Sequence, residues 1–194
     1  ICIQFTQLII LAVIRLVYLG RVKVHIKQSG AHLKGAVILT ANHANQLDPF
    51  VITCFLPVRT ILRIFPFSFM TANIYYHRWW KPLAFLAGCF PAQPHNPQQQ
   101  ENKYGVGKAV TLINQGYSLM MFPEGKRTRT RIPAKPGISR IVSQVKNPVM
   151  LCRIEWKNNN KNTSVNIIYE VADKNIEMDN SDEIMDSIYS LTTD

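Results

Sequence analysis

Two short segments carry side chains whose types and spacing suit acid–base chemistry. In the first, residues 40–50, His43 precedes Asp48 by five positions. Residues five apart diverge on a helix surface, but a loop that turns into a capped helix can bring two such side chains together. The carboxylate would then hold one imidazole nitrogen and leave the other to accept a proton. This segment contains no serine, so such a base would act on a hydroxyl group supplied by a substrate.

The second segment, residues 119–131, is an apolar run that ends in Pro-Glu-Gly and continues into a cluster of cations. The cations are Lys126, Arg127, Arg129 and Arg131. A glycine turn at Gly125 would expose backbone N–H groups, and neighbouring guanidinium groups bind phosphate through two parallel hydrogen bonds. Glu124 would orient an arginine or accept a hydrogen bond from a substrate hydroxyl. The pattern predicts a phosphate-binding loop.

Each segment also has a plainer interpretation. Asp48 would then serve only as the N-cap of a helix whose first residue is Pro49, and His43 would be an ordinary loop residue. The basic run would be a solvated surface loop.

Both segments follow apolar runs that read as strands, within an alternation of strands and helices. We expect strands at 22–26, 36–40, 60–65, 88–91, 117–122, 149–154 and 165–171. We expect helices at 48–55, 79–87, 103–115 and 137–145, and a last acidic helix that Ser181 caps and that ends near Leu191. Residues 93–102 read as a loop, 157–163 as a polar hairpin, and the aromatic-rich stretch 65–80 as core or membrane contact. This alternation predicts an α/β fold with a mixed, mostly parallel central sheet flanked by helices.

The N-terminal residues form a separate apolar element. Residues 1–14 carry no charge, and Gln4, Gln7 and Arg15 fall within roughly 80° of one another on a helix, which leaves a broad apolar face. We therefore expect residues 1–20 to be a membrane-associated helix and 21–194 to be the main domain; the alternative is an ordinary buried helix. Because the chain begins at Ile1 rather than Met, we expect it to be a fragment or a trimmed chain.

Charge limits the classes of partner. Residues 1–169 hold 21 basic and 4 acidic residues, a net charge of +17, whereas eight of the twelve acids lie in the last 25 residues. The net positive charge of residues 1–169 favours binding to a polyanion, an anionic membrane surface or phosphorylated substrates. We expect no nucleic-acid partner, because no helix-turn-helix, zinc-finger or RNA-recognition pattern is present. The four cysteines are widely spaced, which argues against structural zinc and favours reduced thiols.

Together the two segments resemble a known family. The residues from His43 to Asp48 match the His-x-x-x-x-Asp motif of the glycerolipid acyltransferases, and those from Phe122 to Arg127 match the family's Phe-Pro-Glu-Gly-x-Arg motif. The two motifs lie about 80 residues apart, each at the end of an apolar run. The resemblance covers roughly residues 20–155, and its nearest type is lysophosphatidic acid acyltransferase, also called 1-acylglycerol-3-phosphate acyltransferase.

The resemblance implies transfer of an acyl chain from acyl-CoA or acyl carrier protein to the free hydroxyl of a lysophospholipid. His43 would be the general base, with Asp48 orienting it. The glycerol-phosphate end of the acceptor would be held by Glu124, Gly125, Lys126, Arg127, Arg129 and Lys135. No cofactor is implied beyond the acyl donor, and the protein would associate with a membrane at its cytoplasmic face.

Two departures leave the acceptor open. Gln93 stands where the family often has an arginine, and Leu151 stands where a second proline is expected after Pro148. Arg129 or Arg131 would replace the missing cation, or the acceptor would differ from lysophosphatidic acid. Alternatives are a remodelling acyltransferase or transacylase for another lysolipid, a non-enzymatic basic membrane-binding protein, and a cysteine acyl-enzyme that uses Cys54 or Cys89.

Overall fold

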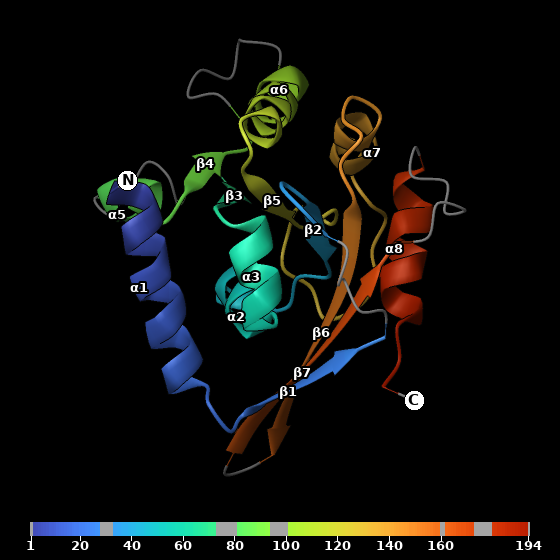
Figure 1. Ribbon diagram of the computed structural model, residues 1–194. Helices are drawn as coiled ribbons and strands as arrows, with labels where there is room; N and C mark the ends of the chain where they lie inside the picture. Colours follow the sequence, from blue (N-terminus) through green and yellow to red (C-terminus); the bar gives the residue numbers. More distant parts are fainter. Residues whose placement is uncertain are drawn as a thin grey trace.

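The computed structural model describes residues 2–27, 33–72, 81–93, 101–159, 162–172 and 180–193. Within them, seven strands form one sheet in the order β1-β7-β6-β2-β5-β3-β4 (Figure 1). The strands are β1 (Val22–Ile26), β2 (Ile38–Ala41), β3 (Phe67–Thr71), β4 (Cys89–Pro91), β5 (Ser118–Met121), β6 (Val149–Asn159) and β7 (Asn162–Val171). The helices are α1 (Cys2–Val17), α2 (Asp48–Phe55), α3 (Val58–Ile64), α5 (Lys81–Leu86), α6 (Glu101–Asn114), α7 (Gly137–Val142) and α8 (Ser181–Ser190).

The centre of the sheet is parallel and fully buried. Every residue of β2 and β5 is buried, as expected for near-continuous apolar strands that are covered on both faces. β2 runs parallel to β5 on one side and to β6 on the other, and the antiparallel pair is β6 with β7. Parallel strands end at the same edge of a sheet, so the loops after Ala41 and Met121 leave it side by side. The predicted α/β fold with a mixed, mostly parallel sheet is confirmed.

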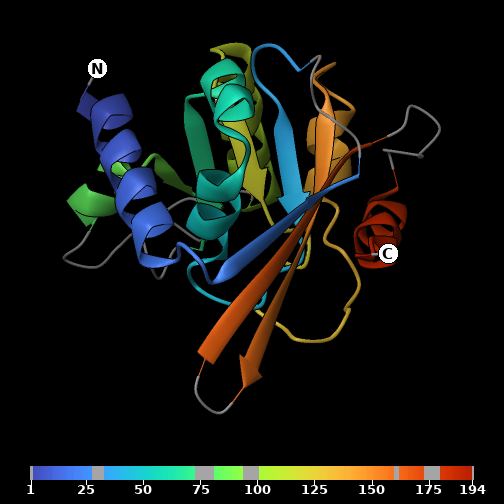
Figure 2. The same cartoon turned by 60° about the horizontal axis from the view of Figure 1, so that its bottom comes forward.

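Helices cover both faces of this sheet and complete a three-layer architecture (Figures 1 and 2). α1, α2 and α3 pack on one face, in a core that includes Leu11, Ile52 and Ile64. α6, α7 and α8 pack on the other face, in a core that includes Ile113 and Ile184.

Helix α1 docks through a face that carries polar Gln7 and Arg15 as well as buried Leu11. Gln7 Nε2 donates to the carbonyl oxygens of Phe67 at 2.6 Å and Ala87 at 3.0 Å, and Arg15 Nη1 donates to that of Cys54 at 2.8 Å. Most of its other apolar side chains face outward, with exposed Phe5, Leu8, Ile9, Val13, Leu16 and Val17. An ordinary buried helix, the alternative for these residues, is therefore wrong. Among the described helices, none is long and apolar enough to span a bilayer.

The strand predicted at residues 60–65 is wrong, because residues 60–64 belong to helix α3 and Phe65 is its C-cap. Pro57 occupies the N-cap position, and of the seven helical residues only Ile64 is buried. A short aliphatic run fits either structure, and here a single side chain inserts into the core while the others stay near the surface. The strand follows instead as β3, whose Phe67 and Phe69 are buried within the aromatic-rich stretch.

Both predicted side-chain caps are also wrong. Asp48 is the first residue of α2 and makes no capping hydrogen bond, because its carboxylate bonds elsewhere. The N-cap of α8 is Asn180, whose side-chain oxygen accepts from the backbone N–H of Asp182 at 3.0 Å. Ser181 instead donates its hydroxyl to Ser139 Oγ at 2.9 Å.

The last two strands extend further than predicted. β6 and β7 pair in register from Met150↔Val171 to Asn159↔Asn162. Most of the predicted polar hairpin, residues 157–163, therefore belongs to the paired part of these two strands. Figure 2 shows this two-stranded ribbon projecting below the body of the protein. The predicted elements that fall on residues 73–80, 94–100 and 160–161 lie outside the described residues.

Candidate active site

The His43 loop is fixed to the sheet before the histidine is reached. Asn42, the first residue after β2, donates through Nδ2 to the Ile154 carbonyl oxygen at 2.9 Å and accepts the Ile154 N–H at 2.8 Å. This buried side chain continues the pairing of β2 with β6 by one more position. The backbone of His43 therefore starts from a defined point at the carboxyl edge of the sheet.

Asp48 folds back over the same loop. Its Oδ2 lies 3.0 Å from His43 Nδ1 and also accepts the backbone N–H groups of Ala44 at 2.6 Å and Asn45 at 2.7 Å. The Asp48 side chain is fully buried, whereas that of His43 is 18% exposed. The pair thus presents one accessible imidazole held by a carboxylate that solvent does not reach. The structure brings His43 and Asp48 together, as the spacing predicted.

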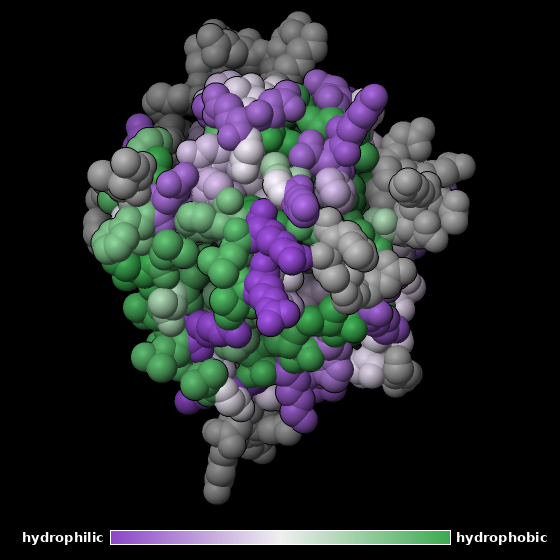
Figure 3. Space-filling view, viewed as in Figure 1, coloured by the Kyte–Doolittle hydropathy of each residue, from purple (hydrophilic) through white to green (hydrophobic). Residues whose placement is uncertain are grey.

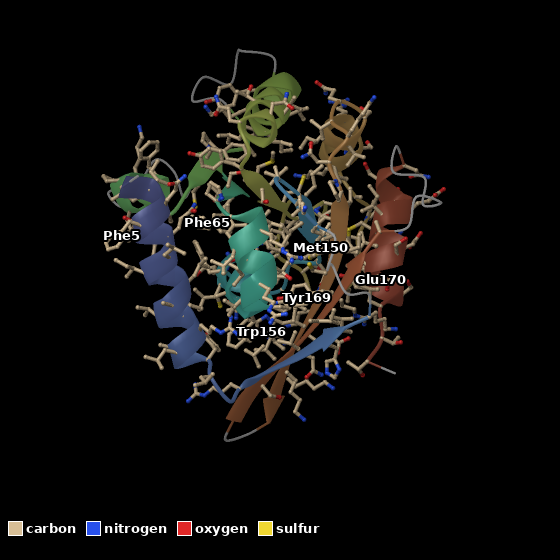
Figure 4. The ribbon with its side chains drawn as sticks, in the orientation of Figure 1. Phe5, Phe65, Met150, Trp156, Tyr169 and Glu170 are labelled. Atoms are coloured by element: carbon tan, nitrogen blue, oxygen red, sulfur yellow. The ribbon has the colours of Figure 1, made fainter. Side chains whose placement is uncertain are left out.

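A tryptophan completes the carboxylate's surroundings. Trp156 Nε1 donates to Asp48 Oδ1 at 2.7 Å from strand β6, beside α2 (Figure 4). Asp48 is thereby hydrogen-bonded on both oxygens, as a buried polar group requires. Sequence reasoning missed Trp156, because nothing near it in the chain indicates a partner more than a hundred residues away.

The bond at Nδ1 decides what the histidine can do. With Nδ1–H donated to the carboxylate, the proton-accepting nitrogen is Nε2, and Asp48 stabilises the imidazolium that forms when Nε2 takes a proton. The ring stacks on Phe122, with the centroids 4.0 Å apart and the planes 15° from parallel. Phe122 belongs to the second motif, so the two motifs are in direct contact. This arrangement suits a general base that deprotonates a hydroxyl.

Glu124 is buried beneath the His43 loop and does not reach the protein surface. It is 1% exposed, and its Oε2 accepts the backbone N–H of His43 at 2.8 Å. Its Oε1 accepts the Tyr189 hydroxyl at 2.8 Å, from helix α8. Burial raises the pKa of the Glu124 carboxyl above its usual range, against the lowering effect of these two hydrogen bonds. The structure therefore engages both oxygens of Glu124 within the protein.

The basic loop is joined to the His43 loop by its backbone. Thr128 N–H donates to the His43 carbonyl oxygen at 2.7 Å. Gly125 has φ of +65°, and a Cβ added there would lie 2.8 Å from three side-chain atoms of Lys135. The positive φ favours glycine at this turn, and the end of the flexible Lys135 side chain occupies the space where a Cβ would lie. The predicted phosphate-binding cations Lys126, Arg127, Arg129 and Lys135 all have exposed side chains on the loop that starts here.

Arg131 does not join these cations. Its Nε lies 2.7 Å from an oxygen of Asp186 and its Nη2 lies 3.7 Å from one of Asp182, both on α8. Gln93, at the position where the family often has an arginine, is exposed just after β4. Arg129 and Arg131 were the two proposed replacements for that arginine. Of these, Arg131 is paired with helix α8.

Cysteine chemistry fits this site poorly. Burial raises the pKa of the Cys54 and Cys89 thiols to about 12, so neither supplies a thiolate at neutral pH. Cys54, Cys89 and Cys152 are free thiols, and the side chain of Cys2 lies outside the described ones. In the described part of the chain, no group of three His, Cys, Asp or Glu side chains is placed to hold a metal ion.

Comparison with known proteins agrees with this geometry. A family model described as acyltransferase matches residues 21–155, more than half of the chain. The fold is similar to the crystal structure of the 1-acyl-sn-glycerophosphate (LPA) acyltransferase PlsC from Thermotoga maritima, with a TM-score of 0.63 and 14% sequence identity. That similarity covers 96% of this chain and 78% of PlsC. At this identity the likeness concerns the fold.

Proposed function

Because the chain belongs to the acyltransferase family, we propose that it transfers a fatty acyl chain from a thioester donor to the free hydroxyl of a lysophospholipid. The donor is acyl-CoA or acyl carrier protein, and the acceptor is 1-acyl-glycerol-3-phosphate, which becomes phosphatidic acid. The observation that carries the proposal is the His43–Asp48 pair, 3.0 Å apart, beside a basic loop that bonds to His43 through Thr128.

The chemical step follows from the nitrogen that is left to react. His43 Nε2 takes the proton of the acceptor hydroxyl as its oxygen attacks the thioester carbonyl, and Asp48 stabilises the imidazolium. The tetrahedral intermediate then collapses, the carbon–sulfur bond breaks, and the leaving thiolate takes the proton from His43. One ester and one thiol are formed, and the histidine returns to its neutral form without a covalent enzyme intermediate.

The exposed cations select the acceptor in this proposal. The acceptor phosphate binds to the basic loop at Arg127, with Lys126, Arg129 and Lys135 nearby and the backbone of Gly125 at the turn. A guanidinium binds a phosphate through two parallel hydrogen bonds and fixes its orientation as well as its charge. Binding the phosphate on this loop would place the glycerol hydroxyl next to His43, since Thr128 and His43 are hydrogen-bonded neighbours.

The pairing of Arg131 with α8 favours a second candidate within the same chemistry. With Gln93 at the arginine position and Arg131 bound to Asp186, a lysolipid with a larger head group is an alternative acceptor, as in a remodelling acyltransferase or transacylase.

A lysolipid panel tests the proposal. The purified protein is given lysophospholipids with different head groups and a lysolipid that lacks phosphate, each with acyl-CoA or with acyl carrier protein donor. We expect mass spectrometry to detect a diacyl product, most rapidly from 1-acyl-glycerol-3-phosphate. His43→Ala should lower the rate by about 100- to 10,000-fold, because a general base contributes that much. Product formation at the wild-type rate by folded His43→Ala would remove the base assignment.

The exposed side of α1 supports a membrane-docking role. Figure 3 shows apolar side chains gathered over the part of the surface where α1 lies. The helix is anchored to the domain by Gln7 and Arg15, and Phe5 and Leu16 are 66% and 72% exposed. We propose that this face lies in the interface of a membrane, at its cytoplasmic side, where the lysophospholipid is found.

Vesicle co-sedimentation tests this docking. Leu16→Glu should reduce binding to anionic vesicles, because it places a charge in the apolar face. Tyr104→Glu is the matched control, since Tyr104 is 44% exposed on α6, on the opposite face of the sheet. Equal binding by both variants would show that α1 does not contact the bilayer.

A further inference from the structure

Helix α8 lies outside the residues that the family model matches, yet it supplies a side chain to the site. The Tyr189 hydroxyl donates to Glu124 Oε1 at 2.8 Å, and Glu124 Oε2 accepts the backbone N–H of His43 at 2.8 Å. A continuous path of two hydrogen bonds therefore runs from the C-terminal helix to the residue that carries the base. Both bonds end on one carboxylate that is 1% exposed.

The helix that carries Tyr189 is held firmly against this region. Asp186 pairs with Arg131 at 2.7 Å, and Asp182 Oδ1 accepts the Ala134 N–H at 3.0 Å. On the other side, the Arg153 guanidinium lies 5.6 Å from the centroid of the Tyr189 ring and donates to the Tyr189 carbonyl oxygen. The hydroxyl is thus delivered to Glu124 from a fixed position.

We propose that Tyr189 is a positioning residue for acyl transfer: through Glu124 it holds the backbone of His43, and so the imidazole, in place. The inference rests on the proposed function. In the proposed reaction Tyr189 touches no reacting atom. Glu124 links Tyr189 to His43 and does not contact the acceptor.

The physical reason is the state of the Glu124 carboxyl. Desolvation raises its pKa, while the His43 N–H, the Tyr189 hydroxyl and a nearby charge on His43 lower it and Asp48 raises it. Loss of the Tyr189 hydroxyl removes one donor and favours the neutral carboxyl. A neutral carboxyl is a weaker acceptor, so it holds the His43 N–H less tightly and no longer supplies a negative charge near the imidazolium.

Steady-state kinetics on Tyr189→Phe test the inference. We expect kcat to fall by about 10-fold, at the lower end of what a hydrogen bond to a charged group contributes, with both KM values unchanged. The acid limb of the kcat–pH profile should move to higher pH. The substitution raises the pKa of Glu124 further, so its charged form is reached only at a higher pH. A loss of folded protein that is the same at every pH leaves the midpoint of that limb in place, so the profile is measured over the pH range in which circular dichroism shows Tyr189→Phe to be folded.

Tyr169→Phe is the matched control, since the Tyr169 hydroxyl donates to the Ile52 carbonyl oxygen at 2.5 Å, in the core. It should lower the melting temperature and leave both kcat and the pH profile unchanged. A shift of the acid limb in this control as well would overturn the inference, because the effect would then be a general one.

A double-mutant cycle with Glu124→Gln separates positioning from stability. If Tyr189 acts through Glu124, Tyr189→Phe should cost less than about 2-fold in kcat in the Glu124→Gln background. Additive losses, or wild-type kcat and pH dependence in Tyr189→Phe, would overturn this inference alone. No turnover by the wild type on any acceptor would overturn the proposed function, and this inference with it.

Discussion

Asp48→Asn places an amide where the structure provides donors on both sides. Oδ2 of Asp48 faces three N–H groups, those of His43 Nδ1, Ala44 and Asn45, and Oδ1 faces the indole N–H of Trp156. An asparagine has one acceptor and one NH₂ group. Whichever way the amide is turned, its NH₂ therefore meets at least one donor in a site that is fully buried.

Two effects of different size follow from this conflict. A buried donor without an acceptor costs about 1–3 kcal/mol, which for a domain of this length lowers the melting temperature by roughly 2–12 °C. The rate falls further, because the neutral amide neither stabilises the imidazolium nor enforces the Nδ1–H tautomer. In a serine-protease triad the same substitution lowers kcat about 10⁴-fold, and we expect a loss of about 100- to 10,000-fold here.

The assay measures kcat at saturating donor and acceptor, together with thermal unfolding followed by circular dichroism. Trp156→Phe supplies the internal control, since it removes the donor that the turned amide would meet. In the wild-type background it should lower the melting temperature, and in the Asp48→Asn background it should lower it much less. Asp48→Asn protein that folds and turns over at the wild-type rate would refute the role of Asp48 and the reasoning from its four donors.

The other predictions concern the second motif. Arg127→Lys should raise the KM for the lysophospholipid by about 10- to 150-fold and leave the donor KM nearly unchanged, since lysine cannot form the bidentate contact; a change in donor KM alone would assign the loop to the donor's phosphates. Gly125→Ala should raise the same acceptor KM, because the new Cβ would displace the Lys135 side chain and strain a backbone with φ of +65°; unchanged kinetics would show that Lys135 is not used. For Glu124, whose pKa is raised in the folded protein, the folded state holds its proton more tightly than the unfolded state. Its contribution to the free energy of unfolding is therefore greatest below the ordinary carboxyl pKa and is lost as the pH rises through the raised value. Glu124→Gln should flatten that part of the stability–pH curve, and a curve of unchanged slope would contradict the assignment.

The sequence predicted the site residues that lie close together in the chain and missed those whose partners are distant in the chain. His43 and Asp48 are five residues apart at the end of a buried strand, so their pairing could be inferred from spacing. Trp156 and Tyr189 reach the same site from strand β6 and helix α8, and nothing beside either residue indicates its partner. Contacts of this kind depend on strand order, which local periodicity does not contain.

The errors in the fold have a similar cause. Residues 60–65 are aliphatic enough for a strand, and their helix is decided by how α3 packs beside α2. The role of Glu124 as an internal link could not be read from its basic surroundings, because the burial that separates it from the cations is set by β5 and α8.

The pairing of β1 with β7 has a consequence for how the protein is made. Val22 lies opposite Val165, so β1 pairs with a strand that follows it by 143 residues in the sequence. A ribosome releases the first strand long before the second, and pairings of such long sequence separation form slowly. During that interval the nascent chain carries both an unpaired strand and the apolar side of α1, and surfaces of these two kinds favour aggregation until translation has passed residue 171.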